Sequence, residues 1–255
     1  MFHWPRYPSV WRCAACRRNA DGPREAGIPV RVIDIVTLRL FVYGSGGFGK
    51  EVMDVARRQN AATRRWEQIC FVDDIRTERA FYGTQVFRFD DAEVAQHLDA
   101  AEFVIAVGEP AGREKLGNKL REAGARLGQV VDVSSLVADT ASLAEGLVVT
   151  PLCSISSDAR LGRNACVNTM SIVGHDVQVG ENTVVSSMVN IGGACVIGAN
   201  SYLGMGALIK EGVRIGSNSI VGMGSVVYSD IPDDVIALGN PARVARPNTD
   251  RKVFK

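Results

Sequence analysis

An aliphatic residue stands at every sixth position of this chain through sixteen successive units, from Val137 to Val227. A period of six fits neither the 3.6 residues of a helical turn nor the alternation of a flat strand. The backbone must therefore turn a corner within each unit, as it does in a hexapeptide solenoid. Similar sequences return every eighteen residues, with Gly or Asn at many corners, so one coil has three flat sides. The pattern predicts a parallel β-helix over residues 135–246, with the aliphatic side chains stacked inside it.

The composition describes a globular chain without a strong attraction for nucleic acid or membranes. Its 255 residues are 46% hydrophobic and 22% charged, and the formal net charge is +1. The sequence contains no run of eighteen apolar residues and no secretory signal, so we expect a cytoplasmic protein. The six cysteines are scattered, which favours reduced thiols. The one close pair, Cys13 and Cys16, offers two of the four ligands of a structural zinc, and we expect no metal site.

The part before the repeats alternates strand-like and helix-like segments. An apolar run, residues 38–43, leads into the glycine-rich turn Gly44-Ser-Gly-Gly-Phe-Gly-Lys50, and a helical pattern follows. Further apolar runs are each followed by turn or helix signals, which predicts a small Rossmann-like parallel sheet. The expected organisation is a poorly ordered extension, this α/β domain, the β-helix and a tail: residues 1–37, 38–134, 135–246 and 247–255.

The glycine-rich turn is suited to hold a phosphate because free backbone N–H groups at a helix start attract anions. A tight turn from strand to helix needs glycine even without a ligand, so the motif alone leaves a purely structural role open. Asp73 and Asp74 close the second strand, where carboxylates commonly meet ribose or base donors in such folds. A Rossmann dehydrogenase does not fit, since the α/β part is short and a β-helix follows it.

Several motifs occur in a fixed order, namely G-S-G-G-F-G-K, V-D-D, Y-G-T-Q-V and F-V-I-A-V-G, followed by the hexapeptide repeats. Over residues 38–246 this order resembles the NeuD/PglD type of sugar O- or N-acyltransferase, within the hexapeptide-repeat family. The resemblance implies a left-handed β-helix, a homotrimer with acetyl-CoA between subunits, and a nucleotide sugar held by the N-terminal sheet. It assigns Gly44, Ser45, Gly46 and Gly49 to the diphosphate or sugar, and Asp73 and Asp74 to the nucleoside. Family members often have histidine at the position of Phe48, and some have histidine at the position of Val184.

His175 is the only histidine of the repeat region and the best candidate for a general base. Acyl transfer from a thioester needs a base for the nucleophile's proton and a donor for the oxyanion, and imidazole titrates near neutral pH. Asp176 can fix its tautomer only if the chain turns here, because neighbouring strand residues point to opposite faces. Gly193 lies one coil further and can offer its N–H to the thioester oxygen. A lone histidine is more often an exposed corner residue, but the resemblance at G-H-D favours catalysis.

The repeated Leu-Gly-Met-Gly and Val-Gly-Met-Gly segments, eighteen residues apart, predict a flat glycine-lined face. The resemblance implies that the pantetheine arm of acetyl-CoA lies along it, with Gly204, Met205, Gly222 and Met223 as the candidate contacts. Glycine and methionine also suit simple packing between coils, and this alternative stays open. Arg243, in Gly-Asn-Pro-Ala-Arg, matches the family's closing motif, which implies a position near the CoA phosphates.

The function predicted is acetyl-CoA-dependent N-acetylation of a nucleotide-linked amino sugar, with His175 as base and direct attack on the thioester. Acetylation of a hydroxyl, on sialic acid or another sugar, is the alternative within the family. A non-catalytic scaffold that binds sugar nucleotides would retain the repeats without a base, so His175 argues against it. A γ-type carbonic anhydrase would need three histidines for its zinc, whereas the repeats contain one.

Overall fold

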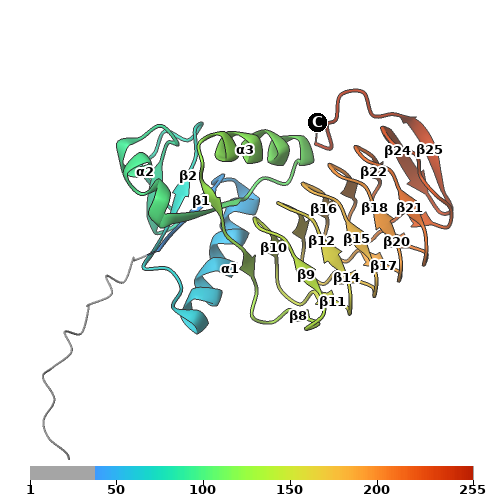
Figure 1. Cartoon of the computed structure of the whole chain (residues 1–255). Coiled ribbons are helices and arrows are strands. Elements are labelled where there is room, and N and C mark those ends of the chain that lie inside the picture. The colour runs from blue at the N-terminus through green and yellow to red at the C-terminus, as the bar shows by residue number, and fades with distance from the viewer. Residues whose placement is uncertain (1–37, 255) are drawn as a thin grey trace, which may run out of the picture. The chain divides into compact units, whose positions relative to one another are not determined.

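The computed structural model describes residues 38–254, which form one compact unit with an α/β part and a β-helix (Figure 1). The extension expected at residues 1–37, with its Cys13 and Cys16, lies outside the described residues. Within the described range, no helix has the length and apolar character needed to cross a membrane.

The α/β part contains a six-stranded sheet in the order β3-β4-β2-β1-β5-β6. Its pairs are parallel except for the short β3–β4 hairpin, in agreement with the predicted Rossmann-like sheet. The elements are β1 (Arg39–Tyr43), α1 (Gly47–Thr63), β2 (Gln68–Val72), β3 (Ala80–Phe81), β4 (Thr84–Phe87), α2 (Ala92–Gln96), the 3-10 turn Leu98–Ala100, β5 (Ala101–Ile105), α3 (Pro110–Glu122) and β6 (Arg126–Leu127). The central strand β1 is apolar and buried because helices or strands cover both of its faces.

The repeats form a parallel β-helix with three sheets, which we call sides 1, 2 and 3. Side 1 contains β7 (Val130–Val131), β10 (Val148–Val149), β13 (Cys166–Val167), β16 (Val184–Val185), β19 (Tyr202–Leu203), β22 (Ile220–Val221), β24 (Val235–Gly239) and β25 (Ala242–Pro247). Side 2 contains β8 (Leu136–Val137), β11 (Ser154–Ile155), β14 (Ile172–Val173), β17 (Asn190–Ile191), β20 (Leu208–Ile209) and β23 (Val226–Val227). Side 3 contains β9 (Ser142–Leu143), β12 (Arg160–Leu161), β15 (Gln178–Val179), β18 (Val196–Ile197) and β21 (Arg214–Ile215).

The eighteen-residue repeat of the sequence is the register of these sheets. Val149 pairs with Val167, for example, and Val173 pairs with Ile191 on the next side. All sixteen aliphatic positions of the six-residue pattern belong to the interior cluster of the β-helix or pack against it. The predicted inward orientation is therefore confirmed.

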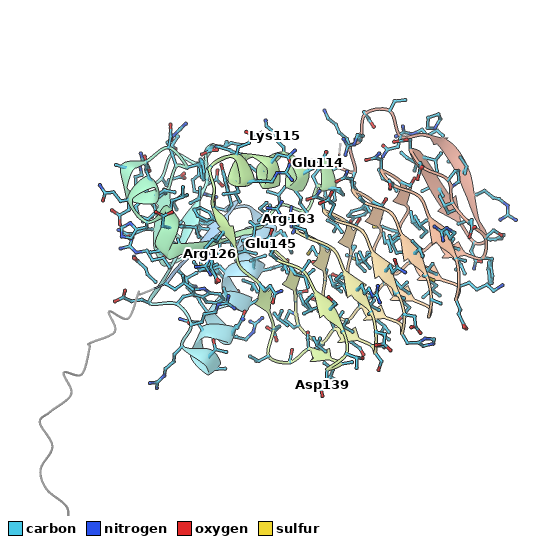
Figure 2. All side chains as sticks on the ribbon, in the orientation of Figure 1. Glu114, Lys115, Arg126, Asp139, Glu145 and Arg163 are labelled. Atoms are coloured by element: carbon cyan, nitrogen blue, oxygen red, sulfur yellow. The ribbon has the colours of Figure 1, made fainter. Side chains whose placement is uncertain are left out.

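The corners between sides 3 and 1 are held by stacked asparagines with positive φ. The Asn164 amide donates to Asn182 Oδ1 at 2.7 Å, and the Asn182 amide donates to Asn200 Oδ1 at 3.0 Å. Asparagine tolerates this backbone region, which explains its recurrence. At the same corner Arg163 and Glu145, one coil apart, form an ion pair of 2.6 Å (Figure 2).

The α/β part packs on side 1. Val148, Cys166 and Val184 point outward from this side into one apolar cluster with residues of α1 and β1. Arg113 of α3 is fully buried and donates to Asn164 of the β-helix corner at 2.9 and 2.8 Å. Side 1 already begins with β7, so its first rung precedes the start expected at residue 135.

Candidate functional site

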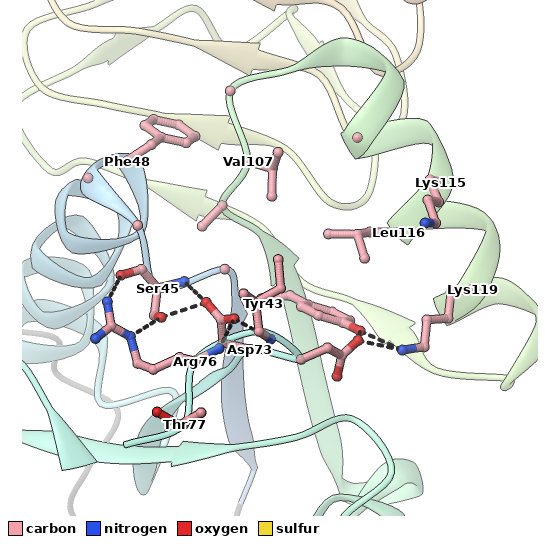
Figure 3. A pocket seen from close by; sticks show the side chains of 18 of the residues that line it. Tyr43, Ser45, Phe48, Asp73, Arg76, Thr77, Val107, Lys115, Leu116 and Lys119 are labelled. Atoms are coloured by element: carbon pink, nitrogen blue, oxygen red, sulfur yellow. Dashed lines mark hydrogen bonds and ion pairs between the residues drawn. The ribbon is translucent and has the colours of Figure 1, made fainter. Parts of the chain in front are cut away.

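A cavity of about 870 Å³ opens at the carboxyl ends of β1, β2 and β5 (Figure 3). Its wall includes Gly44, Ser45 and Gly46 of the glycine-rich turn, together with Asp73 and Asp74, all of which the sequence predicted as binding residues. The remaining lining comes mainly from the segment after β2 and from the β5–α3 loop with α3. Parallel strands commonly bind ligands at this edge.

The glycines of the turn have two different roles. Gly44 has φ +110°, and a Cβ there would lie 2.9 Å from Ala106 O, so only glycine fits. Around Gly46 and Gly47, where α1 begins, a Cβ would meet nothing within 4 Å, so the backbone faces open space. Gly49 does not line the cavity: a Cβ there would lie 2.2 Å from Gly44 O. The expected contact of Gly49 with the diphosphate is thus corrected to a close approach of helix and turn.

Asp73 organises the turn through its own hydrogen bonds. Its carboxylate accepts from Ser45 N at 2.8 Å, from Ser45 Oγ at 2.5 Å, and from the backbone N–H groups of Ile75 and Arg76 at 2.9 and 3.0 Å. Burial raises the pKa of Asp73, but these hydrogen bonds outweigh burial and hold the pKa below its ordinary value. The carboxylate is therefore already occupied by protein donors.

Asp74 belongs to a second network on the opposite wall. It accepts from Tyr43 OH at 2.6 Å, from Lys119 Nζ at 2.7 Å and from Phe89 N at 3.0 Å. Burial opposes ionisation here too, yet Lys119 and Tyr43 lower the pKa of Asp74. Burial and the Asp74 carboxylate raise the pKa of Tyr43, so its hydroxyl stays a donor.

Three cations on the cavity wall, Arg76, Lys115 and Lys119, were missed by the sequence reasoning (Figure 3). Arg76 donates to Ser45 Oγ at 2.6 Å and lies over the ring of Phe81. A signal for the two lysines existed, because positions four apart on a helix lie on one face. That this face of α3 lines the cavity is decided by how the helix packs, which the sequence does not show.

His175 lies at a corner between sides 2 and 3, and its Nδ1 is 2.8 Å from Asp176 Oδ2. The contact is possible because Asp176 has φ +58°, the turn that the sequence reasoning required. Both side chains are 61% exposed. The hydrogen bond that the Asp176 carboxylate accepts raises the pKa of His175 above its ordinary value.

Gly193 lies directly beneath this imidazole, one coil further. A Cβ on Gly193 would lie 2.4 Å from His175 Nε2, so a side chain would displace the ring. Ala194 N donates to His175 O, and Gly212 N donates to Gly193 O, which fixes the predicted column of successive coils. Among residues 38–254, no acceptor engages the N–H of Gly193 itself.

One of the two glycines assigned to acetyl-CoA is required by the coil. A Cβ on Gly204 would lie 2.6 Å from the backbone atom Met223 N, whereas one on Gly222 would lie 2.2 Å from Leu238 Cδ2, the end of an exposed side chain. The contact at Gly204 supports the packing alternative for that glycine. Met205 and Met223 are exposed one coil apart, since Gly224 N donates to Met205 O. The exposed Arg243 donates only to its neighbour Ala242 O, at 2.9 Å, within the part of the chain described.

Comparison with known families and structures identifies both parts of the chain. The PglD N-terminal domain family matches residues 39–120, and the bacterial transferase hexapeptide family matches residues 194–229. A perosamine N-acetyltransferase from Caulobacter crescentus, solved as a histidine-to-asparagine mutant with CoA and GDP-perosamine, is 31% identical. That match covers 80% of this chain and 95% of that chain, with a TM-score of 0.74. The protein belongs to the NeuD/PglD-type hexapeptide-repeat sugar acyltransferases.

Two further sugar-acyltransferase structures have the same architecture. The acetyltransferase domain of PglB from Neisseria gonorrhoeae, in complex with acetyl coenzyme A, is 28% identical, with coverage of 82% and 99% and a TM-score of 0.74. WeeI from Acinetobacter baumannii is 30% identical, with coverage of 82% and 100% and a TM-score of 0.73. No curated protein sequence matches the chain. As in its family, the β-helix is left-handed.

In this acyltransferase the cavity and the histidine lie on different sides of the β-helix. The α/β part packs on side 1 and on the corner of Asn164, between sides 3 and 1. His175 lies at the corner between sides 2 and 3, which is opposite side 1 in a three-sided coil. No three His, Cys, Asp or Glu side chains of residues 38–254 are grouped so that they could hold a metal ion.

Proposed function

We propose that this acyltransferase transfers the acetyl group of acetyl-CoA to the amine of a nucleotide-linked amino sugar. The observation that carries the proposal is the His175–Asp176 pair, 2.8 Å apart, next to Gly193, whose N–H has no acceptor among residues 38–254. A base and an oxyanion donor side by side are what acyl transfer from a thioester requires. The mutated histidine of the Caulobacter enzyme is in keeping with a histidine-dependent reaction.

In the proposed reaction His175 Nε2 accepts a proton from the attacking amine, while Asp176 stabilises the resulting imidazolium at Nδ1. The nitrogen lone pair forms a bond to the thioester carbon, and the carbonyl oxygen becomes an oxyanion that accepts from Gly193 N–H. The carbonyl re-forms as the C–S bond breaks. The departing CoA thiolate takes the proton from the imidazolium, which returns His175 to its neutral form. No acyl-enzyme is needed.

The cavity of the α/β part is proposed to bind the nucleotide. The N–H groups at the start of α1, beside Gly46 and Gly47, with the cations Arg76 and Lys115, suit a diphosphate. Asp73 and Asp74 stay assigned to this end, where we propose that they shape the wall through Ser45 and Lys119. GDP-perosamine in the Caulobacter structures supports a nucleotide-linked acceptor.

Acetyl-CoA as the donor is supported by the PglB domain crystallised with it, and we propose that it lies against the β-helix. Met205 and Met223, exposed one above the other, offer an apolar track for the pantetheine arm, and Gly204 and Gly222 keep that track flat. The guanidinium of Arg243 carries the charge required by the CoA phosphates. The four described thiols are free and buried, in keeping with the expected cytoplasmic compartment.

We propose a homotrimer in which two chains complete each site. One chain carries its cavity and its imidazole on opposite sides of the β-helix, so a cavity needs the His175 of a neighbouring chain. An exposed apolar strip supports such an association. It runs along side 2 and the corner between sides 1 and 2, and comprises Leu136, Leu152, Met170, Ile172, Met188 and Leu208.

The test is thiol release from acetyl-CoA with GDP-, UDP- and dTDP-linked amino sugars and with free sialic acid as acceptors. We expect release with one nucleotide-linked amino sugar, dependent on His175, and a product that resists hydroxylamine because it is an amide. A hydroxylamine-labile ester would instead identify the O-acetyltransferase alternative. Binding of a nucleotide sugar without thiol release from any acceptor would overturn catalysis in favour of a scaffold.

A further inference from the structure

We propose that the C-terminal segment Arg251–Phe254 is a strap that positions the β5–α3 wall of the nucleotide cavity, and that Glu109 is the positioning residue on which it is fastened. This inference rests on the proposed function of the cavity. The strap follows the last strand, β25, and returns to the α/β part. The segment was expected only to be a tail.

Glu109 fastens the strap through its carboxylate. It accepts from Val253 N at 2.6 Å and from Phe254 N at 3.2 Å. Glu109 immediately precedes α3 and follows Gly108, which lines the cavity. A charged acceptor that engages two backbone donors is a strong local restraint. Any movement of the strap therefore displaces Glu109, and with it the adjoining residue Gly108 of the cavity wall.

A second fastening lies one turn along α3. The Arg251 guanidinium is 2.9 Å from Glu114 Oε2, and the other oxygen of Glu114 accepts from the Asn200 amide at 3.1 Å. Glu114 thus joins the strap to the asparagine corner of the β-helix. Figure 2 labels Glu114 and Lys115 as neighbours on α3, and Lys115 lines the cavity.

Packing supports these polar contacts. The Phe254 ring meets the Tyr202 ring edge-on, with centroids 5.8 Å apart, and Tyr202 belongs to side 1. The same ring lies against the loop, since a Cβ on Gly108 would be 3.6 Å from it. Val253 packs on the apolar cluster that α1 shares with side 1. The strap therefore packs against both side 1 of the β-helix and the β5–α3 loop.

Arg113 holds the same loop from inside the molecule. Its NH1 donates to Ile105 O at 2.8 Å and to Val107 O at 3.0 Å, while its other nitrogens bind the Asn164 corner. The strap and Arg113 thus hold the loop from two sides, and together they fix the position of α3 with its lysines. Holding a binding wall in place before the ligand arrives lowers the ordering cost of binding. The strap should accordingly favour nucleotide binding more than acetyl-CoA binding.

The test measures Kd for GDP, UDP, dTDP and acetyl-CoA by calorimetry on the full chain and on Glu109→Ala, Glu109→Gln and Phe254→Ala. For the nucleoside diphosphate that the wild type binds, we expect Kd to rise on the order of tenfold in Glu109→Ala. Glu109→Gln should fall in between, because its amide oxygen still accepts. Lys252→Ala is the matched control, since it removes an exposed cation of the same segment. Thermal unfolding of each variant verifies that it is folded.

Selective weakening of nucleotide binding, with Kd for acetyl-CoA unchanged, supports the strap. If the wild type binds GDP, UDP or dTDP, and Glu109→Ala and Phe254→Ala bind the same nucleotide equally well, the strap is wrong while the proposed function stands. Equal weakening for both ligands also contradicts it, because that outcome indicates general loosening. A wild type that binds none of the three nucleotides overturns the proposed function together with the strap.

Discussion

The imidazole of His175 lies over Gly193, so closely that a Cβ on the glycine would be 2.4 Å from Nε2. Glycine at this position therefore gives the imidazole its place. The backbone N–H of Gly193, which any residue other than proline would also carry, has no acceptor among residues 38–254. Base and oxyanion donor are brought together by the eighteen-residue repeat alone.

Gly193→Ala should displace the imidazole while leaving the β-helix folded. We expect kcat to fall on the order of 10²-fold, as small misplacements of catalytic groups do. Steady-state kinetics and thermal unfolding measure the two effects. Ser157→Ala, in the same column one coil earlier, is the control and should retain activity. Wild-type turnover in Gly193→Ala would show that the position of the ring does not limit the reaction, because alanine keeps the backbone N–H.

Asp176→Asn should move the acidic limb of the pH–rate profile to lower pH. The Asp176 hydrogen bond raises the pKa of His175, and the base must be neutral to accept a proton. Loss of the carboxylate lowers that pKa, so the neutral form persists at more acidic pH, although kcat itself falls. Glu211→Gln should shift the limb in the same direction but less, because the charge of Glu211 raises the pKa of His175 less than Asp176 does. An unmoved limb in Asp176→Asn would assign the titration to another group.

His175→Ala should lose on the order of 10²-fold or more in turnover.

Mixed trimers test whether two chains share each site. His175→Ala and Arg76→Ala are each expected to be inactive as homotrimers, the first without a base and the second without a cavity cation. After unfolding and refolding together in equal amounts, about one quarter of the sites should combine an intact base with an intact cavity. Activity should then recover in proportion. If base and cavity came from one chain, mixing would restore nothing.

The fold followed from the sequence because one period placed one inward side chain in every unit of the repeat. Val149 and Val167 are eighteen residues apart and become neighbours in side 1 whatever else the chain does. The contact of His175 with Asp176 was also within reach, since an aspartate can adopt the positive φ of a corner. Local pattern and local geometry decide both features.

Features that depend on packing between distant segments could not be predicted in this way. Arg76 and Lys115 reach one cavity only because the β2 end and α3 meet across the β1 edge. A glycine pattern also fails to distinguish approach to a ligand from approach to protein backbone. Gly49 and Gly204 face Gly44 O and Met223 N respectively, and no sequence signal separates them from Gly46, which faces open space.

Asp73→Asn should destabilise the protein near neutral pH, and the difference should shrink under acidic conditions. In the folded protein the pKa of Asp73 is lowered, so its contribution is present above the unfolded pKa and is lost as pH falls through the folded pKa. Replacing the carboxylate weakens four hydrogen bonds, and we expect a loss of about 1–3 kcal/mol at pH 7. Denaturant unfolding at pH 7 and at about pH 3, which lies below the ordinary pKa of an aspartate and where the gap is expected to narrow, measures it. Asp99→Asn, an exposed aspartate of the same domain, should leave stability unchanged at both. A gap that widens on acidification would mean that Asp73 is not ionised in the folded protein, and the turn would then be held without a charged acceptor.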